Sequence, residues 1–229
     1  MHFGRVLTEA TPLLLKGLLV TVEVSALSLA IAVLLGLITC LMGLSHNKVL
    51  KAIAKFYIWI MRGTPVMVQA FYVYFAIPQL LQMIFHAPFR MTAFVAGAIT
   101  LSLNAGAYMA EIFRGGVEAV DKGQMEAARS LGLTKGRAMI KIILPQAFRI
   151  CIPSLVNQFI ITIKDTSIVS SISMAEIVYQ ARIYMGNTME SFATWTLVAI
   201  MYLVIISILS AVSRSMERKL KNGQKSQSK

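Results

Sequence analysis

Residues 192–213 read FATWTLVAIMYLVIISILSAVS and contain no formally charged side chain. A membrane-spanning helix needs about 20 consecutive, mostly apolar residues, because the hydrocarbon core of a bilayer is about 30 Å thick. The rest of the 229-residue chain has the same character, since 57% of its residues are hydrophobic and only 14% are charged. A soluble domain has about 25% charged residues. The composition therefore indicates an integral membrane protein and excludes a soluble domain or a disordered chain.

Further apolar stretches of similar length are separated by charged segments and interrupted only by Glu23 and by Lys164-Asp165. The five expected spans cover about 15–43, 56–83, 92–113, 150–173 and 192–213. The sequence thus predicts an all-α integral membrane protein with five transmembrane helices. Its single transmembrane domain covers residues 1–220, includes a long loop at 114–149, and is followed by a flexible tail at 221–229.

The basic residues lie in alternate connections. The formal charge is +12, and 17 of the 22 Lys and Arg residues fall in segments 44–62 and 114–149 and in the tail from Arg214. Basic residues concentrate in cytoplasmic loops of membrane proteins. The N-terminus is therefore expected outside and the C-terminus in the cytoplasm. Because the charge follows the loops, it does not indicate a nucleic-acid partner.

The 114–149 loop has an internal pattern. Residues 124–131 are good helix formers, Gly132 can end that helix, and Thr134 can cap a second one. The letters from Glu126 to Pro145 follow the spacing E-A-A-x₃-G-x₉-I-x-L-P. On composition alone the loop can be a basic connection that only sets the topology.

This pattern resembles the "EAA" loop of the permease subunits of bacterial binding-protein-dependent ABC importers. Other segments are similar to the polar amino-acid branch of that family, over about residues 10–220. They are Arg62-Gly63-Thr64-Pro65 with Gln69, Asn104-Ala105-Gly106-Ala107-Tyr108 with Glu111, and Lys164-Asp165-Thr166-Ser167.

The resemblance implies that the loop helix docks on an ATP-hydrolysing subunit, present in two copies per complex. It also implies a second permease chain, expected as a homodimer, and an extracellular or periplasmic substrate-binding protein. The expected coupling residues are Glu126, Ala127, Ala128, Arg129, Leu131 and Gly132. The chain has no G-x-x-x-x-G-K-[ST] phosphate loop. We therefore expect no cofactor in this chain and no enzymatic activity of its own, with ATP-Mg bound by the partner.

Polar side chains inside the spans are candidates for contact with a transported solute, because a charged one costs roughly 2.5–3.5 kcal/mol to insert. Asn104, Tyr108 and Glu111 lie at i, i+4 and i+7 and share one helix face. Gln158 and Asp165 belong to a polar stripe of the fourth span. The expected substrate-binding residues are Glu23, Gln69, Tyr72, Asn104, Tyr108, Glu111, Gln158, Lys164, Asp165, Thr166 and Ser167.

Simpler interpretations of these residues stay open. The charged side chains Glu23, Glu111, Lys164 and Asp165 can satisfy one another or reach the membrane surface. The polar face of the third span can serve helix packing, and Tyr72 lies in an aromatic run that can be an interfacial belt.

Segment Lys164-Asp165-Thr166-Ser167 predicts a break in the fourth helix, because Thr and Ser hydroxyls compete for backbone groups. Free N–H groups at such a break can hold a substrate carboxylate, and Asp165 suits an ammonium. In the second span, Pro65 and Pro78 are expected to cause kinks.

The chain is therefore expected to be the membrane subunit of an ATP-driven importer that works by alternating access in the inner (cytoplasmic) membrane, surrounded by lipid. The excess of acidic residues in the spans favours a basic amino acid such as arginine, histidine or lysine, or glutamine. The alternatives are a gradient-driven carrier or channel without an ATPase, and a scaffold whose basic loops bind anionic lipid. No metal site and no catalytic residue is expected, since the three histidines lack ligand spacing.

Overall fold

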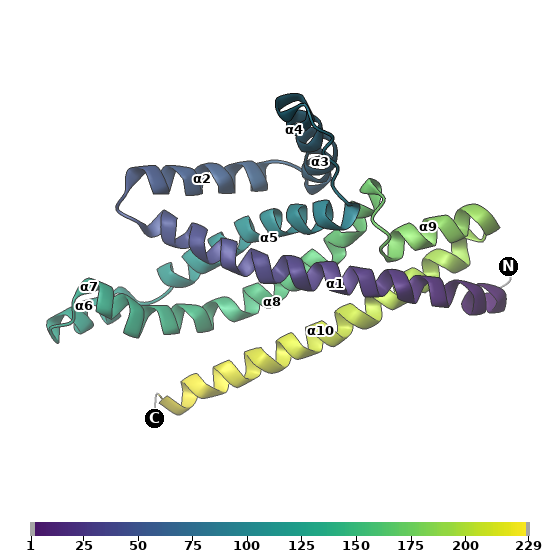
Figure 1. Ribbon diagram of the computed structural model, residues 1–229. Helices are drawn as coiled ribbons and strands as arrows, with labels where there is room; N and C mark the ends of the chain where they lie inside the picture. The colour runs from purple at the N-terminus through teal and green to yellow at the C-terminus, as the bar shows by residue number, and fades with distance from the viewer. Residues whose placement is uncertain (1–2, 228–229) are drawn as a thin grey trace.

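A computed structural model describes residues 3–227, with side chains described as far as Ser215. Within this part of the chain the regular structure is entirely helical (Figure 1). The α-helices are α1 (Phe3–Leu44), α2 (Lys48–Gly63), α3 (Val66–Phe71), α4 (Ile77–Phe85), α5 (Ala93–Glu118), α6 (Lys122–Ser130), α7 (Lys135–Ala138), α8 (Leu144–Val169), α9 (Ile177–Thr188) and α10 (Ser191–Gln227). Two π-turns, η1 (Tyr72–Ala76) and η2 (Met139–Ile143), and a short 3₁₀ turn, η3 (Ser170–Ile172), join some of them.

Within residues 3–227, five helical segments are long and apolar enough to cross a bilayer, which confirms the predicted fold class. They are Phe3–Leu44, Val66–Phe85, Ala93–Glu118, Lys135–Ile172 and Ser191–Ser215. Large apolar side chains such as Leu34 and Leu203 are exposed on them, as expected where lipid tails replace water. The segment 221–229, expected as a flexible tail, is helical up to Gln227, and residues 228–229 lie outside the described part.

α5 packs along both α1 and α8, while α9 and α10 pack against the N-terminal half of α1. Figure 1 shows α6 and α7 at one end of the bundle and α9, with the N-terminus, at the other. We call these the α6–α7 end and the α9 end. Small residues of α5 such as Ala105 and Ala107 are fully or almost fully buried, which lets these helices approach closely.

The second span differs from the prediction of one helix over 56–83. α2 ends at Gly63, and Thr64 and Pro65 are extended, with ψ angles of 144° and 138°. The residue before a proline avoids the helical region because the proline ring clashes with its backbone. The predicted kink at Pro65 is therefore a complete break, and the span that crosses is Val66–Phe85.

The fourth span also differs, because the break predicted at Lys164-Asp165-Thr166-Ser167 is absent. α8 runs without interruption to Val169. The hydroxyl of Thr166 donates to the carbonyl of Ile163, and that of Ser167 donates to the carbonyl of Lys164, both at 2.7 Å. These hydroxyls bond back to carbonyls of the helix, and because α8 is uninterrupted there, its backbone N–H groups are not released for a substrate carboxylate.

Both π-turns directly precede an X-Pro pair. The Ile77 N–H bonds the Tyr72 carbonyl before Pro78, and the Leu144 N–H bonds the Met139 carbonyl before Pro145. A proline ring clashes with the carbonyl four residues earlier, and a π-turn displaces that carbonyl by widening the helix. The chain therefore stays helical through both prolines.

The predicted helix–turn–helix of the 114–149 loop is present. α6 ends in a turn in which Gly132, at φ +83°, donates to the Arg129 carbonyl and Leu133 donates to the Ala128 carbonyl. This is the Schellman arrangement, which requires a left-handed residue and so favours glycine. Thr134 then caps α7. Apolar contacts of Val120, Ile143 and Ala147 hold this unit on the bundle.

Candidate functional site: a polar cavity at the joint of the second span

A polar cavity of about 320 Å³ lies where the α2–α3 joint meets α5 and α8. Four predicted substrate-binding residues share its wall, two from α5 and two from α8. The lining residues are Thr64, Pro65, Val66, Asn104, Tyr108, Gln158, Ile161 and Asp165. The cavity thus brings together the polar faces predicted for the third and fourth spans.

Gln69 stabilises the joint from behind the cavity. Its amide nitrogen donates to the Met61 carbonyl at 2.8 Å and to the Thr64 carbonyl at 3.0 Å. Carbonyls at a helix end have no partner within the helix, so Gln69 satisfies groups that the break releases. Its oxygen accepts a 3.0 Å hydrogen bond from the Asn104 amide. Gln69 therefore fixes the orientation of Asn104 in the cavity wall.

The α8 side of the cavity carries an acidic group without a partner. Among the described residues, the Asp165 carboxylate has no hydrogen bond and no ion pair, and Gln158 has no side-chain hydrogen bond. A buried or half-buried carboxylate is costly without compensation. The arrangement can accept a cationic group and offers amides for further hydrogen bonds.

Glu111 lies one turn beyond Tyr108 on α5 and is already neutralised. Its Oε2 atom is 3.2 Å from a guanidinium nitrogen of Arg62 and 2.9 Å from one of Arg114. Arg114 also pairs with Glu118 at 2.7 Å. The Arg62 guanidinium carbon lies 5.2 Å from the centroid of the Tyr108 ring, a cation–π distance. Glu111 is therefore part of an ion-pair cluster next to the cavity.

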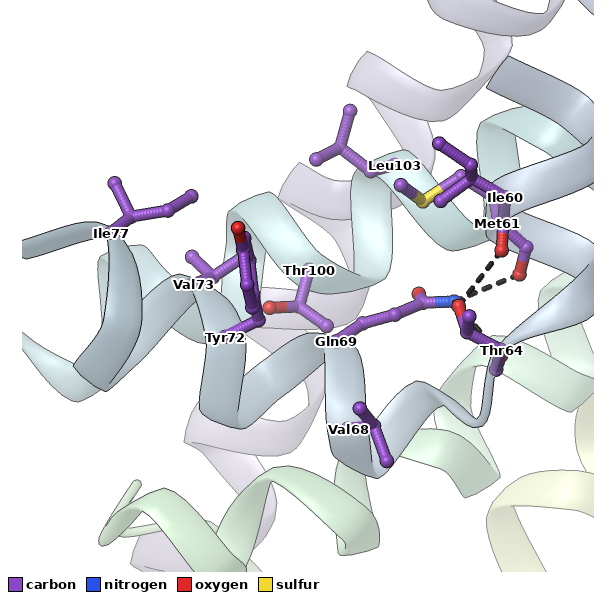
Figure 2. Close-up of a pocket in the computed structure, with 10 residues that line it drawn as sticks. All are labelled: Ile60, Met61, Thr64, Val68, Gln69, Tyr72, Val73, Ile77, Thr100 and Leu103. Carbon is purple, nitrogen blue, oxygen red and sulfur yellow. Dashed lines mark hydrogen bonds between the residues drawn. The ribbon is translucent and has the colours of Figure 1, made fainter. Parts of the chain in front are cut away.

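The remaining predicted residues are dispersed. Tyr72 and Gln69 line a second, mostly apolar cavity of about 470 Å³ between α2, the η1 region and α5, and Figure 2 shows the Gln69 amide pointing to Met61 and Thr64. Lys164 is exposed on α8, and Glu23 is exposed on α1. Neither lines the polar cavity.

The Thr166 side chain is buried and Ser167 is half-buried. Both hydroxyls are used inside α8, as described above, and neither residue lines the polar cavity. The structure therefore offers them no direct contact with a solute in that cavity.

Sequence reasoning missed several cavity residues. Thr64, Pro65 and Val66 line it because the helix breaks there, and the Gly-Thr-Pro letters were a usable turn signal. Arg62 was noticed only as part of a motif. Ile161 carries no sequence signal, since it is one apolar residue among many.

The expected coupling residues occupy the tip of the α6–α7 end. Glu126, Ala127 and Arg129 are exposed, and Leu131 is 83% exposed. Ala128 is buried inside this chain, and its role in a partner contact stays a prediction. Its small side chain serves the packing of α6 on the bundle.

The α9 end holds a separate buried polar group. Glu176 is fully buried and caps α9, accepting a hydrogen bond from the Tyr179 N–H at 2.7 Å and one from the Tyr202 hydroxyl at 3.4 Å. Burial raises the pKa of Glu176 from 4.5 to about 7, although these hydrogen bonds act in the opposite direction.

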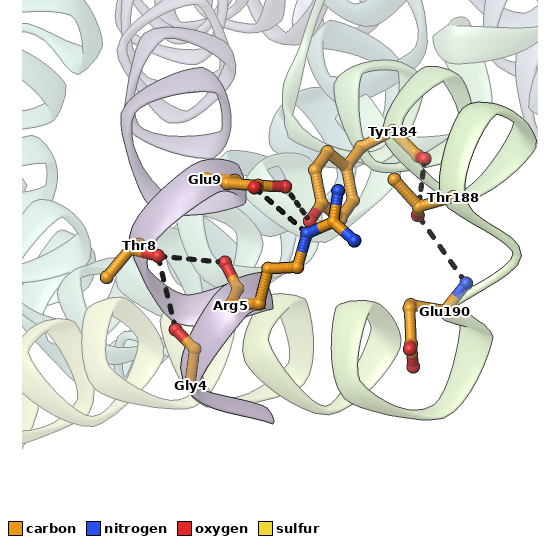
Figure 3. Close-up of polar contacts among 7 residues, drawn as sticks. All are labelled: Gly4, Arg5, Thr8, Glu9, Tyr184, Thr188 and Glu190. Carbon is orange, nitrogen blue, oxygen red and sulfur yellow. Dashed lines mark hydrogen bonds and ion pairs between the residues drawn. The ribbon is translucent and has the colours of Figure 1, made fainter. Parts of the chain in front are cut away.

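A more exposed cluster lies nearby at the start of α1. Arg5 pairs with Glu9 at 3.0 Å, and the Tyr184 hydroxyl donates to Glu9 at 3.2 Å (Figure 3). This contact joins the first turns of α1 to α9.

Residues 11–222 match the family described as binding-protein-dependent transport system inner membrane component. The glutamine transport system permease protein GlnP of Escherichia coli K12 is 37% identical over 212 residues, which are 93% of this chain and 94% of the relative. The arginine transport system permease protein ArtQ of Bacillus subtilis 168 is 37% identical over 214 residues, which are 92% and 94% of the two chains.

Solved structures agree. A crystal structure of an amino acid ABC transporter with histidines has 39% identity and a TM-score of 0.86, covering 93% of this chain and 96% of its own. An inward-facing structure of the MetNI methionine ABC transporter, at 15% identity, has a TM-score of 0.75 over 92% of this chain and 97% of its own, which shows the shared fold. The family match and the relatives together show that this chain belongs to the inner-membrane components of binding-protein-dependent transport systems.

Proposed function

We propose that this chain is the permease subunit of an ATP-driven importer for amino acids, most compatible with a basic amino acid or glutamine. The observation that carries the proposal is the polar cavity with the unpaired Asp165 carboxylate, in a chain of a transport family. Relatives named for glutamine and arginine transport support the substrate class. The chain supplies a passage and moving helices, and it carries out no bond chemistry.

The two ends of an amino acid fit different parts of the cavity. The first-turn N–H groups of a helix have no acceptor within it, and the span that begins at Val66 starts at the cavity wall. A substrate carboxylate is favoured at such a helix start. Asp165 then binds the ammonium or guanidinium group, with Asn104 and Gln158 as hydrogen-bonding neighbours.

The test of this assignment is Asp165→Asn in reconstituted complex, with uptake of a panel of labelled amino acids. Hydrogen bonds to charged groups contribute about 1.5–3 kcal/mol, so we expect the KM for a cationic substrate to rise about tenfold or more. Ser154→Ala, an exposed position of the same helix outside the cavity, is the control. Unchanged kinetics in Asp165→Asn would remove Asp165 from the site.

The tip of the α6–α7 end is the proposed contact with two ATPase subunits, which bind ATP-Mg. Its features are an exposed helix, the exposed Leu131 and the rigid turn at Gly132. ATP binding would draw the ATPases together and move α6 as a rigid body, which opens the spans alternately to either side.

The coupling assignment is tested by Gly132→Val with Gly136→Val as its control. Both glycines have free space for a side chain, but only Gly132 has a positive φ, which a β-branched residue does not tolerate. We expect Gly132→Val to lose ATP-driven uptake and Gly136→Val to retain it. Equal uptake in both variants would contradict the assignment, and uptake driven by an ion gradient without an ATPase would favour a carrier instead.

The basic residues support an orientation with the α6–α7 end in the cytoplasm, the N-terminus outside and the C-terminus inside. A substrate-binding protein would then dock at the α9 end. One chain supplies half of a passage, so a second permease chain, as a homodimer, completes it. Labelling of single cysteines from either side of the membrane tests the orientation.

A further inference from the structure

The ion-pair cluster beside the cavity joins two parts of the chain that the transport cycle must connect. Arg62 is the penultimate residue of α2 and lies two residues before Thr64, in the joint that lines the cavity. Glu111 and Arg114 lie on α5, whose last residue is Glu118. Only Ala119 and Val120 separate that helix from Asp121, the cap of α6.

The contacts form a continuous series from the last residue of α5 to the cavity wall. Glu118 pairs with Arg114, Arg114 with Glu111, and Glu111 with Arg62. Arg62 in turn lies over the ring of Tyr108, which is in the cavity wall. The link between α2 and α5 in this series is the pair Arg62–Glu111.

The pair also has an energetic consequence. Glu111 belongs to a membrane-spanning helix, where an isolated charge is costly and where removing one partner leaves the other uncompensated. Such a pair adds little net stability compared with apolar packing. It does specify which faces of α2 and α5 meet, because guanidinium and carboxylate pair with defined geometry.

We propose that Arg62 is a positioning residue, and that its pairing with Glu111 latches the α2–α3 joint to α5 so that movement of the α6–α7 end is transmitted to the cavity wall. The inference rests on the proposed transport function. It assigns to Glu111 a role in transmission in place of direct substrate binding.

The first test measures the joint itself and requires no transport. Val66→Cys is placed in a Cys40→Ala/Cys151→Ala background, and its alkylation by a water-soluble maleimide is followed in membranes. Both Arg62→Gln and Glu111→Gln remove the Arg62–Glu111 pair and should release the joint that contains Val66. We therefore expect the alkylation rate to rise about fivefold in each variant. The double variant should show no further increase over Glu111→Gln, because both substitutions remove the Arg62–Glu111 contact and Glu111→Gln also removes the pair with Arg114.

Arg5→Gln is the matched control, since Arg5–Glu9 is an ion pair of the same chemistry at the α9 end. It should leave the alkylation rate unchanged. Wild-type alkylation rates in Arg62→Gln and Glu111→Gln, or effects that multiply in the double variant, would overturn the latch.

The second test uses the complete complex in proteoliposomes. Arg62→Gln should lower the number of amino acids transported per ATP hydrolysed while leaving the KM for substrate unchanged. A raised KM at unchanged stoichiometry would place Arg62 in the substrate site and overturn the proposal. If the wild-type complex shows no ATP-driven uptake, the proposed function fails, whereas the alkylation results still decide the latch.

Discussion

The ion-pair cluster around Glu111 and the buried Glu176 of the α9 end hold acidic side chains in opposite ways. On α5, between the cavity and the α6–α7 end, Glu111 and Glu118 are partly exposed and pair with arginines. At the α9 end, Glu176 is fully buried, and among the described residues no basic side chain pairs with it. Charged pairs can exchange partners when helices move, whereas a buried carboxyl held by backbone groups fixes its surroundings. We therefore expect the α9 end to be the more rigid of the two ends and the α6–α7 end the more mobile.

The peripheral helices α9 and α6 also differ in how they pack on the bundle. A Cβ atom at Gly17 of α1 would lie only 2.8 Å from the Ile177 Cα and 2.9 Å from the Glu176 carbonyl carbon. α1 and the start of α9 therefore touch backbone to backbone. At the other end, α6 is held mainly by one small apolar cluster around Val120, and Leu131 extends away from the chain.

The largest effect is expected from Gly17→Val. Overpacking usually costs about 1–3 kcal/mol, and here the contact is with backbone, so we expect the upper end of that range. Gly43→Val, at the other end of the same helix with free space around it, is the control. Thermal unfolding in detergent measures both, and equal melting temperatures would show that the α9 end is not tightly packed.

The next effect concerns pH. Since folding raises the pKa of Glu176 from 4.5 to about 7, the folded state binds the proton more tightly than the unfolded state between these values. The stabilising contribution of Glu176 is then fully present below pH 4.5, decreases as the pH rises, and is lost above pH 7. The free energy of unfolding decreases in this window by at most about 1.4 kcal/mol per pH unit.

We therefore expect a lower melting temperature at pH 8 than at pH 5, and a weaker dependence in Glu176→Gln, which mimics the neutral acid. Glu126→Gln, an exposed position of α6, should retain the wild-type dependence. If Glu176→Gln retains it as well, another group titrates.

A smaller effect is expected from Asp121→Ala. The Asp121 carboxylate accepts a 2.6 Å hydrogen bond from the Gly123 N–H at the start of α6, and loss of such a cap costs about 1 kcal/mol. Because α6 is peripheral, this loss should appear as about fivefold faster limited proteolysis of the loop. A matching drop in the global melting temperature would contradict the independence of this end, and Lys122→Ala serves as control.

The smallest effect on stability is expected from Leu131→Ala. Its side chain is 83% exposed, and surface substitutions usually change stability by less than about 0.5 kcal/mol. Co-purification with the ATPase should nevertheless weaken if Leu131 is buried in that contact. Full retention of the ATPase would leave Leu131 without a role at the interface.

Much of the fold could be predicted from the sequence, because apolar length and the Gly132 turn depend on local properties. The positions of the helix breaks could not be predicted in the same way. A break precedes Pro65, whereas Pro78 and Pro145 follow π-turns, and Pro12 and Pro153 lie inside α1 and α8. Charges and hydroxyls at Lys164–Ser167 looked incompatible with a helix, yet the hydroxyls bond back to the helix itself.

The polar cavity could likewise be predicted only in part from the sequence. Asn104, Tyr108, Gln158 and Asp165 could be found because polar residues in a span are unusual. Their meeting place depends on the break beside Thr64, which no periodicity reveals. α9 was missed because it is short and lacks an apolar run of membrane length.

The π-turn η2 sets the rotation of the loop relative to the fourth span about the α8 axis. A π-turn is equivalent to one residue inserted into an α-helix, and each residue turns a helix by about 100°. Deleting one residue from Met139–Ile143 would restore regular geometry but swing α6 about a third of a revolution around the α8 axis. The extra residue in η2 therefore determines the direction in which the loop points relative to the Asp165 face of α8.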